Sequence, residues 1–178
     1  MKPLHWLASL AIAVSLPALA EINDADGGAM KKLAWANLHE IEAGKLGASK
    51  AQNPEVKRFA QKMADDHGQM LKDLQKLATE KGVKLPDQLG MKEQANMTKM
   101  KALSGERFDK SYMSDMVKDH EKDVRETQEI ADKAQDADFK AAVQKANAKI
   151  KEHLQEAQRV ATAASSPSGS SGSSSAPK

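Results

Sequence analysis

Apolar residues recur along most of the chain at intervals of three and four positions, the spacing that defines one face of an α-helix. Four such stripes, separated by short breaks, predict helices at about residues 28–51, 54–81, 105–133 and 137–164. The four stripes are mutually consistent, which favours one shared core. The pattern therefore predicts an all-α fold.

The breaks between the stripes carry residues that begin and end helices. Asn53-Pro54-Glu55 is a strong helix start, with an N-cap, a proline at the first helical position and an acid in the first turn. Gly82, with Pro86 beyond it, is a strong helix end. Polar residues close to the start of the other stripes are the expected N-caps: Asp24 or Asp26, Ser104, and Asp136.

The lengths of the connections predict the topology. The first two helices and the last two are joined by only a few residues, so each pair is expected to be antiparallel. Residues 83–103 separate the pairs and carry an apolar spacing that predicts a short surface helix. A crossover of this length predicts a ferritin-like antiparallel four-helix bundle, with the second and third helices parallel. A plain up-down bundle with a decorated loop is the alternative.

Both ends of the chain differ from the helical region between them. Residues 1–20 contain Lys2, then an apolar run too short to cross a bilayer, then an Ala-Leu-Ala cleavage site, which is the order of a signal peptide. Cleavage after Ala20 would place the mature chain in the periplasm or outside the cell. Residues 165–178 are almost wholly Ser, Gly and Pro and predict a disordered tail. The helical domain is therefore expected within residues 21–164.

Composition narrows the class of protein further. Aromatic residues make up only 3% of the chain while helix formers are abundant, which excludes an all-β protein. The formal net charge is +2 with the two signs interspersed, so no nucleic-acid partner is expected. The chain has no cysteine, which excludes disulfides, thiolate catalysis, Cys-ligated zinc and iron–sulfur clusters. No transmembrane span is expected once the signal peptide is removed.

Three histidines occupy positions where a helical stripe would carry core residues. His67, His120 and His153 fall within about 40° of their stripe centres, and Glu40 lies on the flank of the first stripe. Counting from the two hairpins puts Glu40 level with His67, and His120 level with His153, all near mid-helix. Bundles build metal sites from imidazole and carboxylate groups on facing helices. The sequence therefore predicts a metal-binding layer of these four residues.

Neighbouring side chains affect which metal is expected. Three imidazoles and a carboxylate suit copper, zinc or iron, and thioether sulfur would favour copper(I). The further candidate ligands are Met63, Met70, Met116 and Asp109, with Asp123 as another oxygen ligand or partner. By helical phase, His39 is expected to point away from the core, and Asp66 and Asp119 are expected in solvent. The alternative is that the methionines fill gaps and the histidines only form hydrogen bonds.

A weak internal repeat links two of the predicted helices. Residues 59–67 and 112–120 share the pattern aromatic-x-x-x-Met-x-x-Asp-His. Duplication of a helical pair would explain this repeat.

Several short motifs are spread over the helical region: Glu40–Gly44, Val56–Ala60 with Met63–His67, Gly82–Pro86, Ser104–Asp109 with Tyr112-Met113, Met116–His120, and His153-Leu154. Through these motifs residues 29–161 resemble an exported bacterial ferritin-like family of unknown function, whose members often carry the label "outer membrane protein". The resemblance implies a ferritin-like four-helix bundle and no established activity. The Glu-x-x-His pattern of di-iron centres is absent at all three histidines, so a classical di-iron site is not predicted.

Three classes of function remain. The first is an exported protein that binds or buffers a transition metal. The second is a non-catalytic structural or stress-related interaction protein whose core histidines only form hydrogen bonds. The third is a metal-dependent oxidase or peroxide-consuming enzyme; no nucleophile–base pair, phosphate loop or acid pair indicates hydrolysis or phosphoryl transfer. The pattern favours a binding protein over an enzyme and names no protein partner.

Overall fold

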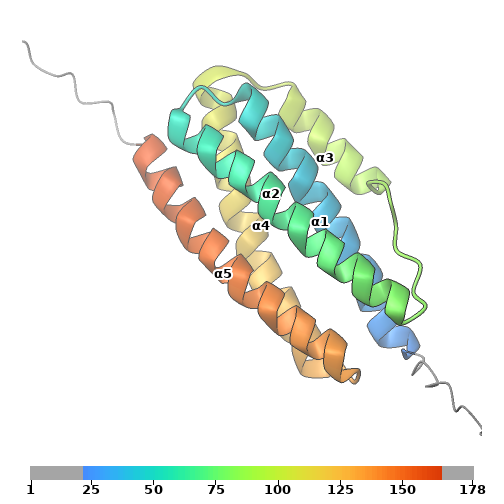
Figure 1. Ribbon diagram of the computed structural model, residues 1–178. Helices are drawn as coiled ribbons and strands as arrows, with labels where there is room; N and C mark the ends of the chain where they lie inside the picture. Colours follow the sequence, from blue (N-terminus) through green and yellow to red (C-terminus); the bar gives the residue numbers. More distant parts are fainter. Residues whose placement is uncertain (1–21, 166–178) are drawn as a thin grey trace, which may run out of the picture.

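The computed structural model describes residues 22–165, and all regular secondary structure in this range is helical (Figure 1). The predicted all-α fold is confirmed for these residues, while the predicted signal peptide and residues 166–178 of the predicted tail lie outside them. Ser165, predicted as the first residue of the tail, is instead the last residue of a helix. None of the described helices is long and apolar enough to cross a membrane. The helices are α1 (Asp24–Lys50), α2 (Pro54–Glu80), α3 (Met91–Lys101), α4 (Gly105–Lys133) and α5 (Ala137–Ser165).

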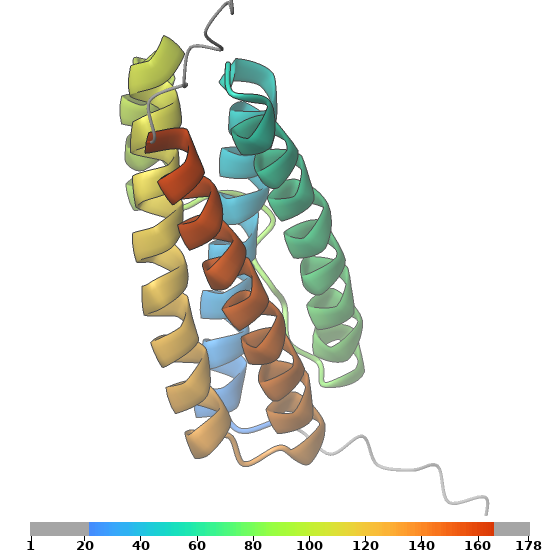
Figure 2. The same cartoon turned by 90° about the vertical axis from the view of Figure 1, so that its left-hand side faces the viewer.

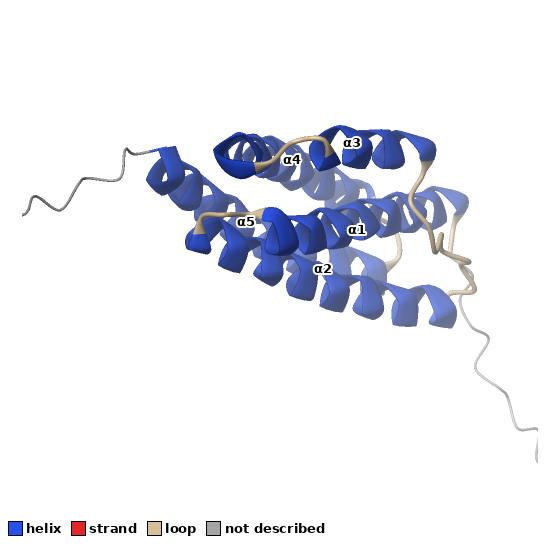
Figure 3. Ribbon diagram, turned by 90° about the horizontal axis from the view of Figure 1, so that it is seen from above, coloured by secondary structure: helices blue, strands red, loops and turns tan. Residues whose placement is uncertain are grey.

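The four long helices form two antiparallel hairpins, α1 with α2 and α4 with α5 (Figures 1 and 2). The connection after α2 returns along the length of the molecule before α4 begins, so α2 and α4 run in the same direction. Seen from above, α3 lies on the outside of α1 and α4 (Figure 3). Met97 and Met100 of α3 are buried against the hairpin helices, which confirms the short helix predicted in the crossover.

Local sequence signals set the helix boundaries. The side chain of Asn53 accepts hydrogen bonds from backbone N–H groups in the first turn of α2, the nearer at 2.8 Å. Asp136 accepts one at 2.9 Å from the first turn of α5. After α2, Gly82 adopts a φ of 71°, a conformation that glycine takes without strain and that closes the helix end.

Two N-cap predictions need correction. At α1 the cap is Asn23, whose side-chain oxygen accepts from the backbone N–H of Asp26 at 2.9 Å, and α1 begins at Asp24, earlier than expected. Ser104 does occupy the N-cap position of α4, but its side chain makes no capping hydrogen bond.

Each hairpin loop is held by a buried aspartate from the other hairpin. Asp109 of α4 accepts hydrogen bonds from two backbone N–H groups of the α1–α2 loop, and Asp26 of α1 accepts two from the α4–α5 loop. N–H groups at a helix start lack partners within the helix, so these carboxylates satisfy them and fix the hairpins against each other. The donors to Asp109 are Gln52 and Asn53, with shortest N–O distances of 3.2 and 2.8 Å. The donors to Asp26 are Gln135 and Asp136, with N–O distances of 3.0 and 2.9 Å.

These contacts reveal an internal twofold relation with a spacing of 83 positions. Asp26 corresponds to Asp109, 83 positions later, and the loop donors at 52 and 53 correspond to those at 135 and 136. It also joins the last residue of α1, Lys50, to the last residue of α4, Lys133. The relation therefore pairs α1 with α4 and α2 with α5. The repeat between residues 59–67 and 112–120 joins α2 with α4, so it is not a trace of this duplication.

α1 and α2 approach each other closely at two glycines. A Cβ atom on Gly44 would lie 2.7 Å from the backbone nitrogen of Ala64 and 2.8 Å from the backbone oxygen of Ala60. A Cβ atom on Gly47 would lie 2.7 Å from the Cβ atom of Ala60 and 2.8 Å from the ring of Tyr112 on α4. All four distances are shorter than van der Waals contact, so the packing of α1 requires glycine at these two positions.

The buried side chains form two apolar clusters with polar residues between them. One cluster lies toward the α1–α2 loop and contains Phe59, Met63 and Met116, and the other lies toward the α4–α5 loop and contains Leu74 and Phe139. The intervening buried polar residues, called the polar layer below, are Asn37, Glu40, His67, His120, Thr127, Asn147 and His153.

Candidate metal centre

Three histidines of the polar layer converge in the interior. His67 of α2, His120 of α4 and His153 of α5 are at most 2% exposed, and their ring centroids are 5.2–5.6 Å apart. One nitrogen from each ring lies within 4.8 Å of the other two. A tetrahedral zinc ion with Zn–N bonds of about 2.0–2.1 Å needs its nitrogens about 3.3 Å apart. Small movements of the rings would therefore bring the three nitrogens to a metal-ligand distance.

The orientation of His67 is fixed by an asparagine of α1. Asn37 donates its side-chain N–H to the backbone oxygen of Leu33 at 2.8 Å, so its amide oxygen faces His67. That oxygen lies 3.0 Å from His67 Nδ1, which must then carry the proton and donate. The proton at Nδ1 leaves a lone pair at Nε2.

The other two imidazoles are fixed in the same way by different acceptors. His120 Nδ1 lies 2.9 Å from the backbone oxygen of Met116 and donates to it. His153 Nε2 lies 2.8 Å from a carboxylate oxygen of Asp66, which also binds Lys62 at 2.7 Å. Amide, backbone and carboxylate oxygens are the groups that orient metal-binding histidines from behind.

Each ring is left with one nitrogen that has no hydrogen-bond partner among the described residues. These nitrogens are His67 Nε2, His120 Nε2 and His153 Nδ1, and all three are shielded from solvent. Because the opposite nitrogen of each ring carries the proton, each offers a lone pair. A buried polar atom without a partner costs free energy. One metal ion can accept all three lone pairs at once.

Burial also sets the charge of the three rings. It lowers the pKa of His67 well below the ordinary value, and the neighbouring His120 and His153 lower it further. Burial lowers the pKa of His120 although the backbone oxygen of Met116 opposes the shift. It lowers the pKa of His153 to about 4 against the effect of Asp66. The imidazoles are therefore neutral at neutral pH, the form that binds metals.

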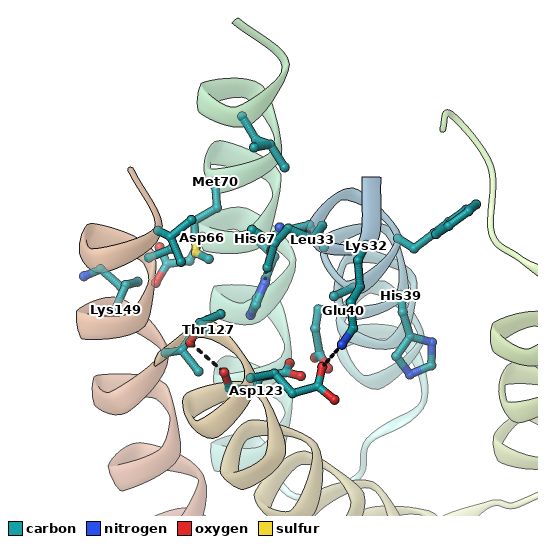
Figure 4. A pocket seen from close by; sticks show the side chains of 18 of the residues that line it. Lys32, Leu33, His39, Glu40, Asp66, His67, Met70, Asp123, Thr127 and Lys149 are labelled. Atoms are coloured by element: carbon teal, nitrogen blue, oxygen red, sulfur yellow. Dashed lines mark hydrogen bonds and ion pairs between the residues drawn. The ribbon is translucent and has the colours of Figure 1, made fainter. Parts of the chain in front are cut away.

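A cavity of about 1040 Å³ reaches the polar layer from the surface. The buried residues Asn37, His67 and Glu40 line it. Figure 4 shows His67 and Glu40 together with Met70 and Lys149, which are half-buried and also line it. His67 is thus the edge of the histidine group that faces this cavity.

The structure places Glu40 in a second group rather than among the three histidines. His39 and Glu40 of α1 and Asp119 of α4 each contribute one ligand atom, and these atoms lie within 4.8 Å of one another. Because Glu40 lies on the flank of its stripe, its side chain reaches toward α4, as Figure 4 shows by its approach to Asp123. His39, expected to point away from the core, is half-buried on this side of α1, and Asp119, expected in solvent, is half-buried as well.

Burial raises the pKa of two acids in this region, Glu40 and the neighbouring Asp123. Burial raises the pKa of Glu40 well above its ordinary value, and Asp123 and Asp119 raise it further. Burial raises the pKa of Asp123 to about 6 against the effect of Lys122.

The remaining candidate ligands lie in three different environments. Met63 and Met116 are fully buried in the apolar cluster next to the polar layer. Met70 is half-buried and lines the cavity. Asp109 lies eleven residues before His120 on α4, about 16 Å along the helix, and binds the α1–α2 loop, so the structure does not bring it to the histidines.

Sequence reasoning missed the residues that orient the rings. The sequence pattern assigns no role to Asn37 and predicts Asp66 in solvent, yet each accepts a hydrogen bond from a histidine of a different helix. A polar residue in an apolar stripe, about one turn from the level of a histidine on the facing helix, is the available signal for Asn37. For Asp66 the partner lies on α5, 87 positions away, and no local pattern indicates it.

Fold and site together define an all-helical domain with a buried histidine cluster that can hold a metal ion. The chain belongs to the family described as Domain of unknown function (DUF4142), whose family model matches residues 13–160. The predicted membership of a family of unknown function is thereby confirmed.

The fold is also found in a solved structure of another family. The chain is similar to the crystal structure of a DUF305 fragment from Deinococcus radiodurans, with a TM-score of 0.71 and 9% sequence identity. The similarity covers 80% of this chain and 99% of that chain, and at this identity it shows the fold alone. No curated protein gives a significant match to this chain.

Proposed function

We propose that this protein is an exported metal-binding protein that holds a copper or zinc ion through His67, His120 and His153. The observation that carries the proposal is the set of three neutral, buried imidazoles. Each is fixed through one nitrogen and keeps a lone pair at the other, without a partner among residues 22–165. The ring centroids are 5.2–5.6 Å apart, and a metal ion would satisfy the lone pairs that the core leaves without a partner.

The donor set favours copper or zinc over a di-iron centre. Three nitrogens suit both metals, whereas a di-iron centre needs several carboxylates between its ions. The three residues that precede the histidines by three positions are Ala64, Val117 and Ile150, so none supplies the required glutamate. A four-coordinate ion would take its fourth ligand from water in the cavity or from a methionine sulfur, for which Met63, Met70 and Met116 are the candidates.

The proposed architecture is a ferritin-like four-helix bundle, and the proposed location is the periplasm or the medium. Two antiparallel hairpins joined by a long crossover, with α2 parallel to α4, support this topology. The signal-peptide pattern of residues 1–20 supports export. Sequencing the N-terminus of the protein recovered from a bacterial periplasm should find Glu21 as the first residue.

Metal titration of the purified protein tests the proposed site. One equivalent of zinc or copper(I) should bind to the cluster of three histidines. The bound metal should raise the melting temperature, because a ligand at one hundred times its Kd stabilises a folded protein by about 2.7 kcal/mol. His120→Gln should bind the metal at least tenfold more weakly. Val143→Ala is the control, because it removes volume from the core beside the cavity without removing a nitrogen.

The control separates loss of a ligand from loss of stability. Val143→Ala should melt at a lower temperature yet respond to metal as the wild type does. If neither zinc nor copper changes the melting temperature of the wild type, and His120→Gln lowers it equally with metal and with chelator, the histidines are structural and the proposal is wrong.

A further inference from the structure

The cavity that reaches His67 also contains a second group of metal-ligand side chains. His39, Glu40 and Asp119 all line it, and one ligand atom from each lies within 4.8 Å of the others. The two α1 residues are adjacent in sequence, and Asp119 faces them from α4. The group is distinct from the histidine cluster, with which it shares no residue.

Glu40 is buried in this group without a hydrogen bond to one of its oxygens. The residue is 2% exposed, and its Oε2 has no partner in the part of the chain that the structure describes. The Nδ1 atom of the neighbouring His39 is also shielded and has no partner in that part. A carboxylate oxygen and an imidazole nitrogen of this group are thus each shielded and left without a partner, which costs free energy unless a ligand satisfies them.

No lysine forms an ion pair with Glu40 or Asp119 among the described residues. The ammonium groups of Lys32 and Lys122 lie 3.0 and 3.3 Å from Glu126, and Lys122 only partly offsets the rise in the pKa of Glu40. Within residues 22–165, no lysine or arginine lies within 4.0 Å of the carboxylates of Glu40 or Asp119. Asp123, 3.9 Å from Lys122, adds a further carboxylate to the region.

From this geometry we propose a second cation site, in which His39, Glu40 and Asp119 bind a divalent metal ion such as Co²⁺ or Zn²⁺. One imidazole and two carboxylates suit divalent ions, whereas a set without sulfur and dominated by oxygen is poor for copper(I). The site is half-exposed, so it exchanges its ion with solvent more readily than the buried histidines do. It goes beyond the function proposed above, because it can exist whether or not the histidine cluster binds metal.

Cobalt is the probe, because its binding can be counted by equilibrium dialysis and followed by its absorption. The full-length protein should bind two Co²⁺ ions per chain, and Glu40→Gln should bind one. Glu42→Gln is the matched control, because Glu42 lies two residues away on α1, is exposed and binds only Lys45, at 2.8 Å. Glu42→Gln should keep both ions. Circular dichroism confirms that each variant is folded.

Occupying the histidine cluster first makes the two sites separable. A protein saturated with copper(I) should still bind one Co²⁺, with at least a tenfold loss of affinity in Glu40→Gln and in His39→Gln. If the wild type binds one Co²⁺ that His120→Gln loses and Glu40→Gln retains, the second site does not exist and the histidine site stands. If Glu40→Gln loses that ion and His120→Gln retains it, the second site stands and the histidine cluster does not bind Co²⁺; the zinc and copper(I) titration then decides the function proposed above.

Discussion

Replacing Asp66 by asparagine tests how much an orienting residue contributes to metal binding at the three histidines. Asp66 accepts a hydrogen bond from His153 Nε2 at 2.8 Å and is itself not a candidate ligand. Asparagine has nearly the same shape and can still accept the bond through its amide oxygen. The substitution therefore removes the negative charge behind the imidazole and leaves the ring in place.

The expected loss of zinc affinity follows from the strength of the hydrogen bond between Asp66 and His153 and from the exposure of the Asp66 side chain. A hydrogen bond to a charged group is worth about 1.5–3 kcal/mol, and each 1.4 kcal/mol is about tenfold in affinity. Orienting partners of metal ligands accordingly contribute about 10–100-fold to affinity. The side chain of Asp66 is 32% exposed and also binds Lys62, so solvent and the lysine screen its charge. We therefore expect the lower end, about a tenfold increase in the Kd for zinc.

The assay is a competition titration with a chelating dye of known zinc affinity. Asp65→Asn is the control, because Asp65 is the adjacent residue, is exposed and accepts a hydrogen bond only from Gln61, at 3.0 Å. It should bind zinc with the affinity of the wild type. Equal zinc affinities of Asp66→Asn and Asp65→Asn would refute the view that Asp66 supports a metal ligand.

Three further predictions concern stability, measured by urea unfolding. Gly44→Ala should lower the free energy of unfolding by about 1–3 kcal/mol, because its methyl group meets backbone atoms of α2. Gly68→Ala, whose methyl group would meet nothing within 4 Å, should raise it by up to about 1 kcal/mol. Equal effects of the two substitutions would contradict the close packing at Gly44. Asp109→Ala should cost about 1–3 kcal/mol by leaving the α1–α2 loop N–H groups without their acceptor, and no loss would contradict the clamp. Since the pKa of His153 is about 4 when folded and about 6.5 when unfolded, its stabilising contribution is complete above pH 6.5 and is lost as the pH falls toward 4. In metal-free protein the stability difference between wild type and His153→Gln should therefore shrink by at most about 3 kcal/mol over that range, and a constant difference would contradict the shift.

Periodicity predicted the helices because their boundaries are encoded locally. Asn53, Gly82 and Asp136 act within one turn of themselves, so their roles follow from sequence. The same holds for the histidines: three rings near the centres of apolar stripes, at matching distances from the hairpins, must meet if the helices pack around one core. Their convergence is therefore a consequence of helix geometry alone.

The partners of the histidines could not be predicted in the same way. Glu40 lies on the flank of its stripe, and whether a flanking side chain turns to the centre or to the neighbouring helix depends on which helix covers that flank. The half-buried positions of His39 and Asp119 depend on the packing of α1 against α4, which no periodicity specifies. The contact between Asp66 and His153 likewise depends on how α2 packs against α5.

The internal twofold relation also relates the residues of the histidine cluster. A shift of 83 positions carries Asn37 onto His120, His67 onto Ile150 and Met70 onto His153. At these three corresponding positions the second hairpin provides two imidazoles and the first provides one.

The first hairpin uses its remaining two positions differently. Asn37, at the position that corresponds to His120, supplies the oxygen that orients His67. Met70 corresponds to His153, a proposed ligand, and it is half-buried and lines the cavity that His67 faces. Met70 therefore occupies the position that corresponds to a proposed ligand, which makes its sulfur a candidate for the fourth ligand. The Met70 sulfur would contribute more to the affinity for copper(I) than to the affinity for zinc, because copper(I) prefers soft thioether ligands.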